Sequence, residues 1–154
     1  MNIIYDVILK KIEKDILSYN SQLQAPATDR EIKSVKQSSK NILKVNLPEE
    51  YLTFLKKCNG LDYNGTVIYA TDRKPIVGYD DRYIEGIISA NLSARDVEMM
   101  KQFLIFGESD DLIHTLDLSK NKYRTIEAIG HSLYAEYDSF DQLLDYVLNE
   151  AFNM

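Results

Sequence analysis

The chain has 154 residues, of which 45% are hydrophobic and 27% are charged, which is typical of one globular domain and too apolar for a disordered chain. It carries 18 basic and 24 acidic side chains, and this net charge of −6 argues against a general nucleic-acid binder, which needs a basic face. The single cysteine, Cys58, excludes an intramolecular disulfide. No apolar stretch predicts a membrane span or signal peptide, so we expect a cytoplasmic protein without a membrane partner.

The charge is distributed unevenly along the chain. Residues 1–58 carry 10 basic and 7 acidic side chains, a net of +3, whereas residues 59–154 carry 8 basic and 17 acidic ones, a net of −9. A strongly negative surface attracts a basic partner and speeds its approach. Solubility alone is the alternative explanation for the same pattern.

Two helices are predicted before residue 41. Isoleucines recur every four residues from Ile4 onward, with lysines and acids between them, which indicates an amphipathic helix over about residues 3–19. Thr28 and Glu31 form a capping-box pattern, in which each side chain can pair with the backbone N–H of the other residue. We therefore expect a second, peripheral helix from there to about Lys40.

A third helix has well-marked ends in the sequence. Pro48 suits the first helical position, where its missing N–H costs no hydrogen bond, and Asn59-Gly60 supplies a left-handed stop. Cys58 belongs to the apolar stripe of this helix, so we expect it to be buried and structural. The β-branched and aromatic segment 66–69 then predicts the first strand.

The remaining residues predict one more helical region, a meander of strands and a terminal helix. Residues 79–100 look helical, with Asp80 or Asp81 as the cap and a break near 91–93. The pattern Ser-Phe-Asp-Gln that begins at Ser139 predicts the cap of the terminal helix. The strands between these helices are expected at 103–106, 112–118, 123–128 and 133–137, with turns at 107–111, 119–122 and around Gly130.

This order of elements favours the α+β class over one domain that spans residues 1–154. Helices come first, short strands follow, and tight turns can join only antiparallel neighbours. We expect N-terminal helices, a central, mostly antiparallel twisted sheet of about four to five strands, and a C-terminal helix packed on the sheet.

The search for a nucleophile gives no strong candidate. Cys58 lies at the predicted C-terminal end of a helix, where unpaired carbonyl groups disfavour a thiolate. Ser109, His114 and Asp117 could be assembled into a triad, but no G-x-S-x-G nucleophile elbow surrounds the serine.

Metal and phosphate sites are equally weak in the sequence. The histidines, His114 and His131, do not form a pair at ligand spacing, and the Gly60…Gly65 spacing lacks the lysine of a phosphate-binding loop. We therefore predict no cofactor, no metal and no enzymatic activity. Acid-dependent hydrolysis through paired carboxylates is the least favoured alternative.

Acidic pairs beside tyrosines are the best candidates for a binding surface. Carboxylates attract a basic protein, and tyrosine buries a large area at low entropic cost. Solvated turns and core tyrosines are the alternative explanation. The candidate partner-binding residues are Tyr79, Asp80, Asp81, Tyr83, Glu108, Asp110, Asp111, Tyr134 and Tyr137.

Three segments resemble a known family. Leu47–Gly60, which reads LPEEYLTFLKKCNG, is similar to the LPxxYxxFLxxxNG signature of the SUKH superfamily, and 104–111 resembles its Phe-Gly strand end with an acidic turn. Residues 87–92 look closest to the YrhA-like branch, and the whole resemblance covers roughly 28–150. The residues that carry the signature are Leu47, Pro48, Tyr51, Phe54, Leu55, Asn59, Gly60, Phe106 and Gly107.

The resemblance implies an α+β fold, no known catalytic activity and, for many bacterial members, a role as an immunity protein to a toxin, often a nuclease. Two hypotheses follow: the chain neutralises a basic protein toxin by covering its active site, or it is a housekeeping regulatory or scaffold protein with a cellular protein partner. The signature itself is expected to serve folding, because its residues start, pack and stop a helix. The sequence leaves the oligomeric state open.

Overall fold

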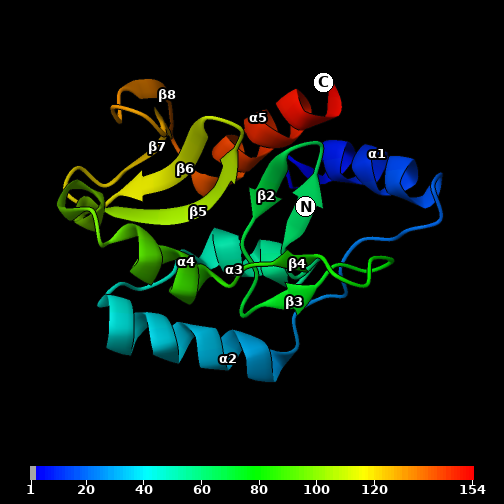
Figure 1. The fold of residues 1–154 in the computed structure, drawn as a ribbon, viewed down its shortest axis with the longest axis horizontal. Helices are drawn as coiled ribbons and strands as arrows, with labels where there is room; N and C mark the ends of the chain where they lie inside the picture. The colour runs from blue at the N-terminus through cyan, green and yellow to red at the C-terminus, as the bar shows by residue number, and fades with distance from the viewer. Residues whose placement is uncertain (1–2) are drawn as a thin grey trace.

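The computed structural model describes residues 3–154 as helices that cover an antiparallel sheet (Figure 1). The first helices are α1 at Asp6–Leu17, α2 at Asp29–Ser38, the π-helical turn η1 at Ser39–Leu43 and α3 at Glu49–Leu55. The strands are β1 Leu61–Tyr63, β2 Thr66–Ile68, β3 Lys74–Pro75, β4 Tyr83–Ile84, β5 Phe103–Ser109, β6 Leu112–Asp117, β7 Lys122–Glu127 and β8 Leu133–Tyr137. The later helices are α4 Ile87–Ala94, the 3₁₀ turn η2 Glu98–Gln102 and α5 Phe140–Phe152.

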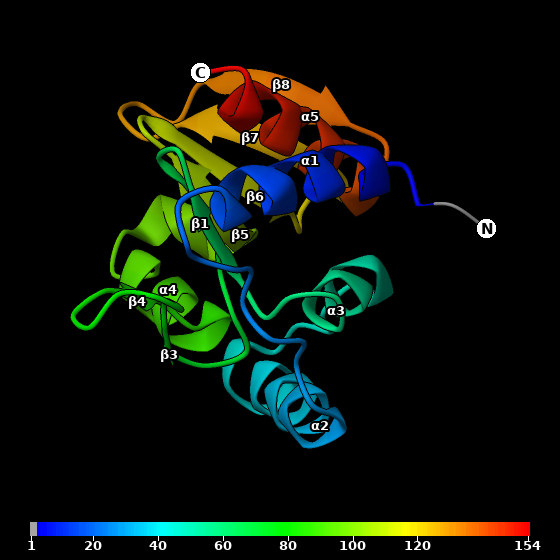
Figure 2. The same ribbon diagram turned by 90° about the vertical axis from the view of Figure 1, so that its right-hand side faces the viewer.

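Six strands form the main sheet in the order β1-β2-β5-β6-β7-β8, and every neighbouring pair is antiparallel. Strands β3 and β4 form a separate hairpin. Helices α1 and α5 lie side by side over one face of the main sheet (Figure 2), and α4 packs against β5. The predicted α+β class is confirmed. The sheet exceeds the expected four to five strands because the three-residue β1 pairs with β2 through the tight turn Asn64-Gly65.

The local signals for the helices correspond to observed contacts. The Thr28 hydroxyl accepts from the backbone N–H of Glu31 at 3.1 Å, and the Glu31 carboxylate accepts from the backbone N–H of Thr28 at 3.0 Å. The Ser139 hydroxyl likewise caps α5. Helix α1 buries Ile12 and Ile16 through the predicted spacing of four. Within residues 3–154, no helix combines the length and apolar character that crossing a membrane requires.

An aromatic cluster joins the helices to the sheet. Tyr51 of α3, Phe106 of β5 and Phe140 of α5 are fully buried, and their ring centroids lie 4.9–5.6 Å apart. The tilted and edge-to-face arrangements are those that aromatic pairs prefer. This cluster fixes α5 over the sheet, and α5 in turn forms one wall of the cavity described below.

Several signature residues make contacts that hold the fold together. The Tyr51 hydroxyl donates to the carbonyl of Tyr69 at 2.7 Å, and the buried Asn59 amide pairs with both the backbone N–H and the hydroxyl of Thr71 at 2.9 Å. At Gly107 an added Cβ would lie 2.1 Å from the carbonyl oxygen of Val67, so strand β2 leaves no room for a side chain there.

Two details of the signature helix differ from the prediction. Pro48 has an extended ψ of 139° and precedes the helix as its N-cap, so it does not occupy the first helical position. The helix ends at Leu55, and Gly60, with φ of +89°, lies in the connection to β1. The predicted left-handed glycine is therefore present, but it lies directly before β1 and does not end the helix. Asn59 bonds the backbone N–H of Thr71.

The predicted helix over 79–100 is wrong in its first half. Strand β4 occupies that part, and Asp80 and Asp81 lie in the β3–β4 loop, where they cap no helix. The backbone on both sides of Gly86 pairs with Ala70; Ile84 is buried in strand β4, and Ile87 is buried as the first residue of α4. Contacts distant in sequence therefore outweigh the helical spacing of these isoleucines.

Strand β5 is longer than predicted and contains a β-bulge. It runs to Ser109, so Gly107 and Glu108 belong to the strand and not to a turn. The pairing with β6 shifts between Ile105 and Gly107, which leaves Phe106 as the extra residue. Phe106 packs against Phe140 of α5, with 4.9 Å between the ring centroids.

Candidate functional site

Five of the nine candidate binding residues line two cavities, and the other four lie outside both. We call the first the hairpin pocket, which lies between the end of α1, the segment 21–24, strand β1 and the loop 76–82. We call the second the α5 pocket, which lies between the β5–β6 turn, strand β8 and the C-terminal half of α5. The two cavities have volumes of about 440 Å³ and 370 Å³.

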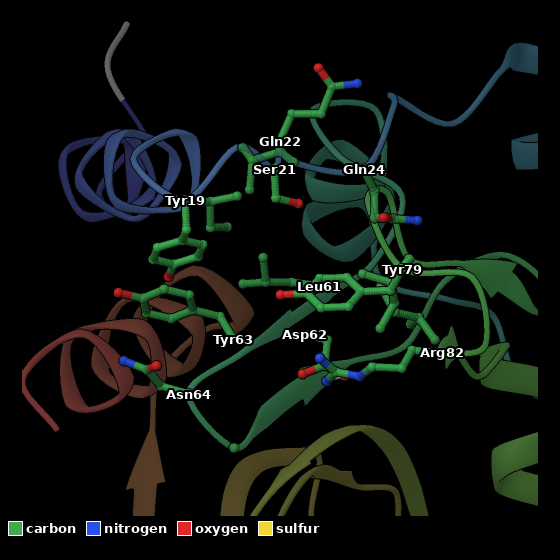
Figure 3. Close-up of a pocket in the computed structure, with 15 residues that line it drawn as sticks. Tyr19, Ser21, Gln22, Gln24, Leu61, Asp62, Tyr63, Asn64, Tyr79 and Arg82 are labelled. Atoms are coloured by element: carbon green, nitrogen blue, oxygen red, sulfur yellow. Dashed lines mark hydrogen bonds and ion pairs between the residues drawn. The ribbon is translucent and has the colours of Figure 1, made fainter.

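The hairpin pocket is bounded by a loop that side chains fasten to the opposite wall. The Ser21 hydroxyl donates to the carbonyl of Val77 at 2.8 Å, and the Gln24 amide donates to the carbonyl of Pro75 at 2.9 Å. Figure 3 shows Tyr79 extending from this loop into the cavity. The tyrosine proposed from the sequence therefore lines a pocket.

The carboxylates around the hairpin pocket are already occupied by groups of the same chain. Arg82 lies 3.1 Å from the Asp62 carboxylate and stacks over the Tyr79 ring at 4.8 Å, as the close-up shows (Figure 3). On the opposite side, Tyr63 and Tyr19 both donate to the Asp15 carboxylate, at 2.6 and 3.1 Å. The cavity therefore has tyrosine walls but little uncompensated charge.

The other candidates near the β3–β4 hairpin lie outside that cavity. Asp80 and Asp81 are exposed in the loop, and Tyr83 lies beneath the guanidinium of Arg73 at 4.3 Å. Glu108 is also separated from its sequence neighbours, because it points to the opposite face of β5 from Ser109 and lies 3.4 Å from the Tyr69 hydroxyl.

The α5 pocket brings together four of the predicted residues, Asp110, Asp111, Tyr134 and Tyr137. The two aspartates form the tight turn between Ser109 and Leu112, which are paired in the ladder. Asp110 adopts φ of +48°, a left-handed conformation that aspartate tolerates in short hairpin loops. The turn therefore presents both carboxylates at the same end of the sheet.

A second β-bulge brings both tyrosines of β8 into the pocket. Residues 134 and 137 differ by an odd number, so a regular strand would direct their side chains to opposite faces. The pairing with β7 shifts, however: Thr125 pairs with Ala135 and Ile126 pairs with Leu133, which leaves Tyr134 as the extra residue. Tyr134 and Tyr137 consequently line the same cavity.

Helix α5 adds two residues that the sequence analysis missed, Tyr146 and Glu150. They lie one helical turn apart on the exposed side of the helix. The hydrogen-bonding Glu150 carboxylate raises the pKa of the Tyr146 phenol to about 12. An i, i+4 tyrosine and glutamate pair on the polar face of the terminal helix was the signal that could have identified them.

The charge of the α5 pocket is uncompensated. Three carboxylates line it, from Asp110, Asp111 and Glu150, and no lysine or arginine of the described chain does. None of the ion pairs found among residues 3–154 includes these three carboxylates. The pocket is therefore negatively charged at neutral pH.

A chain of hydrogen bonds forms the floor of the α5 pocket. The atoms Thr66 Oγ1, Ser109 Oγ, His114 Nε2 and Nδ1, Thr125 Oγ1 and Tyr137 Oη follow one another at 2.8–3.0 Å, across strands β2, β5, β6, β7 and β8. Burial lowers the pKa of His114 to about 4, so the imidazole is neutral at neutral pH. A neutral imidazole accepts at one ring nitrogen and donates at the other, which links the hydroxyls on both sides.

These hydrogen bonds show whether Ser109, His114 and Asp117 form a triad. Ser109 and His114 are in contact at 2.8 Å, but the other ring nitrogen meets Thr125 and not Asp117. Asp117 bonds Ser119 and Arg124 instead. The carboxylate that orients the base of a hydrolytic triad is therefore not in place.

Cys58 has the buried position that the sequence suggested. The thiol is fully buried, and burial raises its pKa to about 12, so it is a structural residue. Within the described range 3–154, no cluster of three or more His, Cys, Asp or Glu side chains is arranged to hold a metal ion.

The helices, the antiparallel sheet and the signature contacts define an α+β domain of the SUKH superfamily. The chain belongs to the SMI1/KNR4 family (SUKH-1), whose model matches residues 26–146. Membership supports a protein-binding domain of the immunity or regulatory type, in a family that is generally non-enzymatic. The curated proteins contain no match to this chain. The YrhA-like branch stays a prediction.

Proposed function

We propose that this chain is a non-catalytic cytoplasmic protein that neutralises a basic protein toxin by binding over its active site. The observation that carries the proposal is the α5 pocket, which is lined by three tyrosines and by three carboxylates that make no ion pair within residues 3–154.

The charge of this pocket suits a partner that handles nucleic acid. A nuclease needs a basic surface to bind phosphates, and that surface is complementary to a cavity rimmed by carboxylates. Tyr134 and Tyr146 are 51% and 41% exposed, so both rings are available for contact. Tyrosine and charge together are typical of the residues that dominate protein interfaces.

A capture experiment tests the proposal. The tagged chain is used to isolate partners from its source cells, and association with the captured protein is followed by stopped flow. Reversing Asp110 and Asp111 to lysine is expected to slow association at least about tenfold, because steering depends on this field. The same reversal at Asp80 and Asp81, which lie in the exposed loop beside the hairpin pocket, is the matched control and should slow association less.

Two results would contradict the proposal. An association rate that is unchanged by the Asp110 and Asp111 reversals and by added salt would exclude electrostatic steering by this surface. Capture of a cellular protein without toxin activity would favour the regulatory or scaffold alternative.

A further inference from the structure

We infer that the α5 pocket accepts one arginine side chain of the partner. This inference rests on the proposed function and specifies the chemistry that the pocket recognises.

The tyrosine walls of the pocket fit a planar cation. Tyr137 and Tyr146 lie with ring centroids 5.8 Å apart and planes inclined by 50°, and the bulged Tyr134 lines the same cavity. Guanidinium groups stack on aromatic faces, which attract cations through the ring quadrupole. A cavity of about 370 Å³ is at the small end of ligand pockets and suits a side chain better than a folded segment.

Two exposed tyrosines of the same chain lie beneath arginine side chains. Arg73 lies 4.3 Å from the ring centroid of Tyr83, and Arg82 lies 4.8 Å from that of Tyr79. Arg82 also pairs with a carboxylate, that of Asp62. Within residues 3–154, the α5 pocket contains the tyrosines and carboxylates of this arrangement but no arginine.

The carboxylates and the floor select for positive charge. The planar fork of arginine can bond two carboxylate oxygens at once, which a lysine ammonium cannot do in the same geometry. The His114 imidazole in the floor is neutral because burial lowers its pKa to about 4, so it does not repel a cation at neutral pH. An anion would meet Asp110, Asp111 and Glu150 without a counter-charge.

A peptide titration tests this inference directly. The probes are acetyl-Gly-Arg-Gly-amide and the matched peptides with citrulline or lysine in place of arginine, and binding is followed by amide chemical shifts of the whole protein. We expect saturable binding of the arginine peptide, with shifts at the β5–β6 turn, β8 and the C-terminal half of α5. The citrulline peptide, which has the same shape without charge, should bind at least tenfold more weakly, and the lysine peptide should also be weaker.

Charge-neutralising variants localise the site. The double variant Asp111→Asn and Glu150→Gln should lower the affinity for the arginine peptide at least tenfold. The control Asp80→Asn and Asp81→Asn removes the same charge from the exposed hairpin loop and should change the affinity less than twofold. Equal binding of the citrulline peptide, or an equal loss in the control, would overturn the inference.

The inference and the proposed function can fail separately. If the arginine peptide does not bind while the Asp110 and Asp111 reversals still slow association with the captured toxin, the docking surface stands and the arginine pocket is excluded. If the peptide binds at this pocket but no toxin is captured, the pocket stands and the proposed function is wrong.

Discussion

The hairpin pocket and the α5 pocket both reach the β1–β2 turn and are built from the same kinds of residue. Asn64 and Gly65 of the turn line the first, and Thr66 lines the second. In the hairpin pocket Arg82 of the same chain already pairs with the carboxylate of Asp62 and stacks on tyrosine. In the α5 pocket the carboxylates and tyrosines have no arginine partner within residues 3–154. The presence or absence of an arginine therefore distinguishes the two pockets.

The two pockets also differ in what holds their walls. The hairpin pocket is closed by a loop that hydrogen bonds from Ser21 and Gln24 fasten to the other wall. The α5 pocket has a floor of sheet residues in a continuous hydrogen-bonded chain that includes the buried His114. A substitution in the floor should therefore affect stability much more than one in the hairpin pocket.

The largest effect is expected from His114→Ala. The change leaves the hydroxyls of Ser109 and Thr125 without the partner that joins them, and it opens a cavity, so we expect a loss of about 3–5 kcal/mol. Urea denaturation measures the difference. Tyr79→Ala in the hairpin pocket is the comparison and should cost less than about 1 kcal/mol, because that ring is 42% exposed. Similar losses for the two variants would remove the distinction between the pockets.

A loss of stability of intermediate size is expected when the pH is lowered. Burial lowers the pKa of His114 to about 4, whereas the unfolded chain binds the proton near the ordinary value of 6.5. The contribution of His114 to stability is therefore complete above about pH 6.5 and decreases as the pH falls toward 4, by up to about 3 kcal/mol. Urea denaturation between pH 7 and 4.5 should show this decrease.

The effect of Asp141, at the start of α5, on the pH dependence of stability must be separated from that of His114. Burial and the neighbouring Glu50 charge raise its pKa to about 6, so its ionisation opposes folding, and its effect has the opposite sign over the same range. The comparison is therefore made between Asp141→Asn and the double variant with His114→Gln. An identical loss of stability in both on acidification would contradict the assignment to His114.

The smallest effect on stability is expected from Arg82→Gln. An exposed ion pair contributes little, so the loss of the contact with Asp62 should cost less than about 1 kcal/mol. The variant frees the Asp62 carboxylate and the Tyr79 face, and the hairpin pocket should then gain weak binding of the arginine peptide in the same titration. If the arginine peptide causes no amide chemical-shift change at the hairpin pocket of the variant, a free carboxylate beside a free tyrosine face is not sufficient to bind arginine.

The predictable part of the fold depended on short-range signals. The capping box at Thr28 and the cap at Ser139 correspond to observed hydrogen bonds, and the meander from 103 to 137 follows the predicted turns, apart from the extension of β5 to Ser109. The error over 79–86 arose because the chain on both sides of Gly86 pairs with Ala70, and no local pattern encodes that contact.

Four of the nine candidate residues predicted from the sequence line the α5 pocket, but their grouping there could not be predicted. Acid pairs and tyrosines can be read from composition and turns, yet strand alternation separates Glu108 from the α5 pocket. The membership of Tyr134 depends on a bulge, and that of Glu150 depends on how α5 crosses β8. Each of these is decided by pairing and packing between distant segments.

The bulge at Tyr134 allows one wall of the α5 pocket to change separately from the rest of the fold. Deleting Tyr134, the extra residue, would leave Leu133 paired with Ile126 and Ala135 paired with Thr125 in a regular ladder, and would remove this ring from the pocket wall. The loss of one residue from this edge strand would thus remove an aromatic wall of the α5 pocket. It would leave the aromatic cluster of Tyr51, Phe106 and Phe140 in place. The residue that shapes this pocket wall and the residues that hold the aromatic cluster therefore lie in separable parts of the fold.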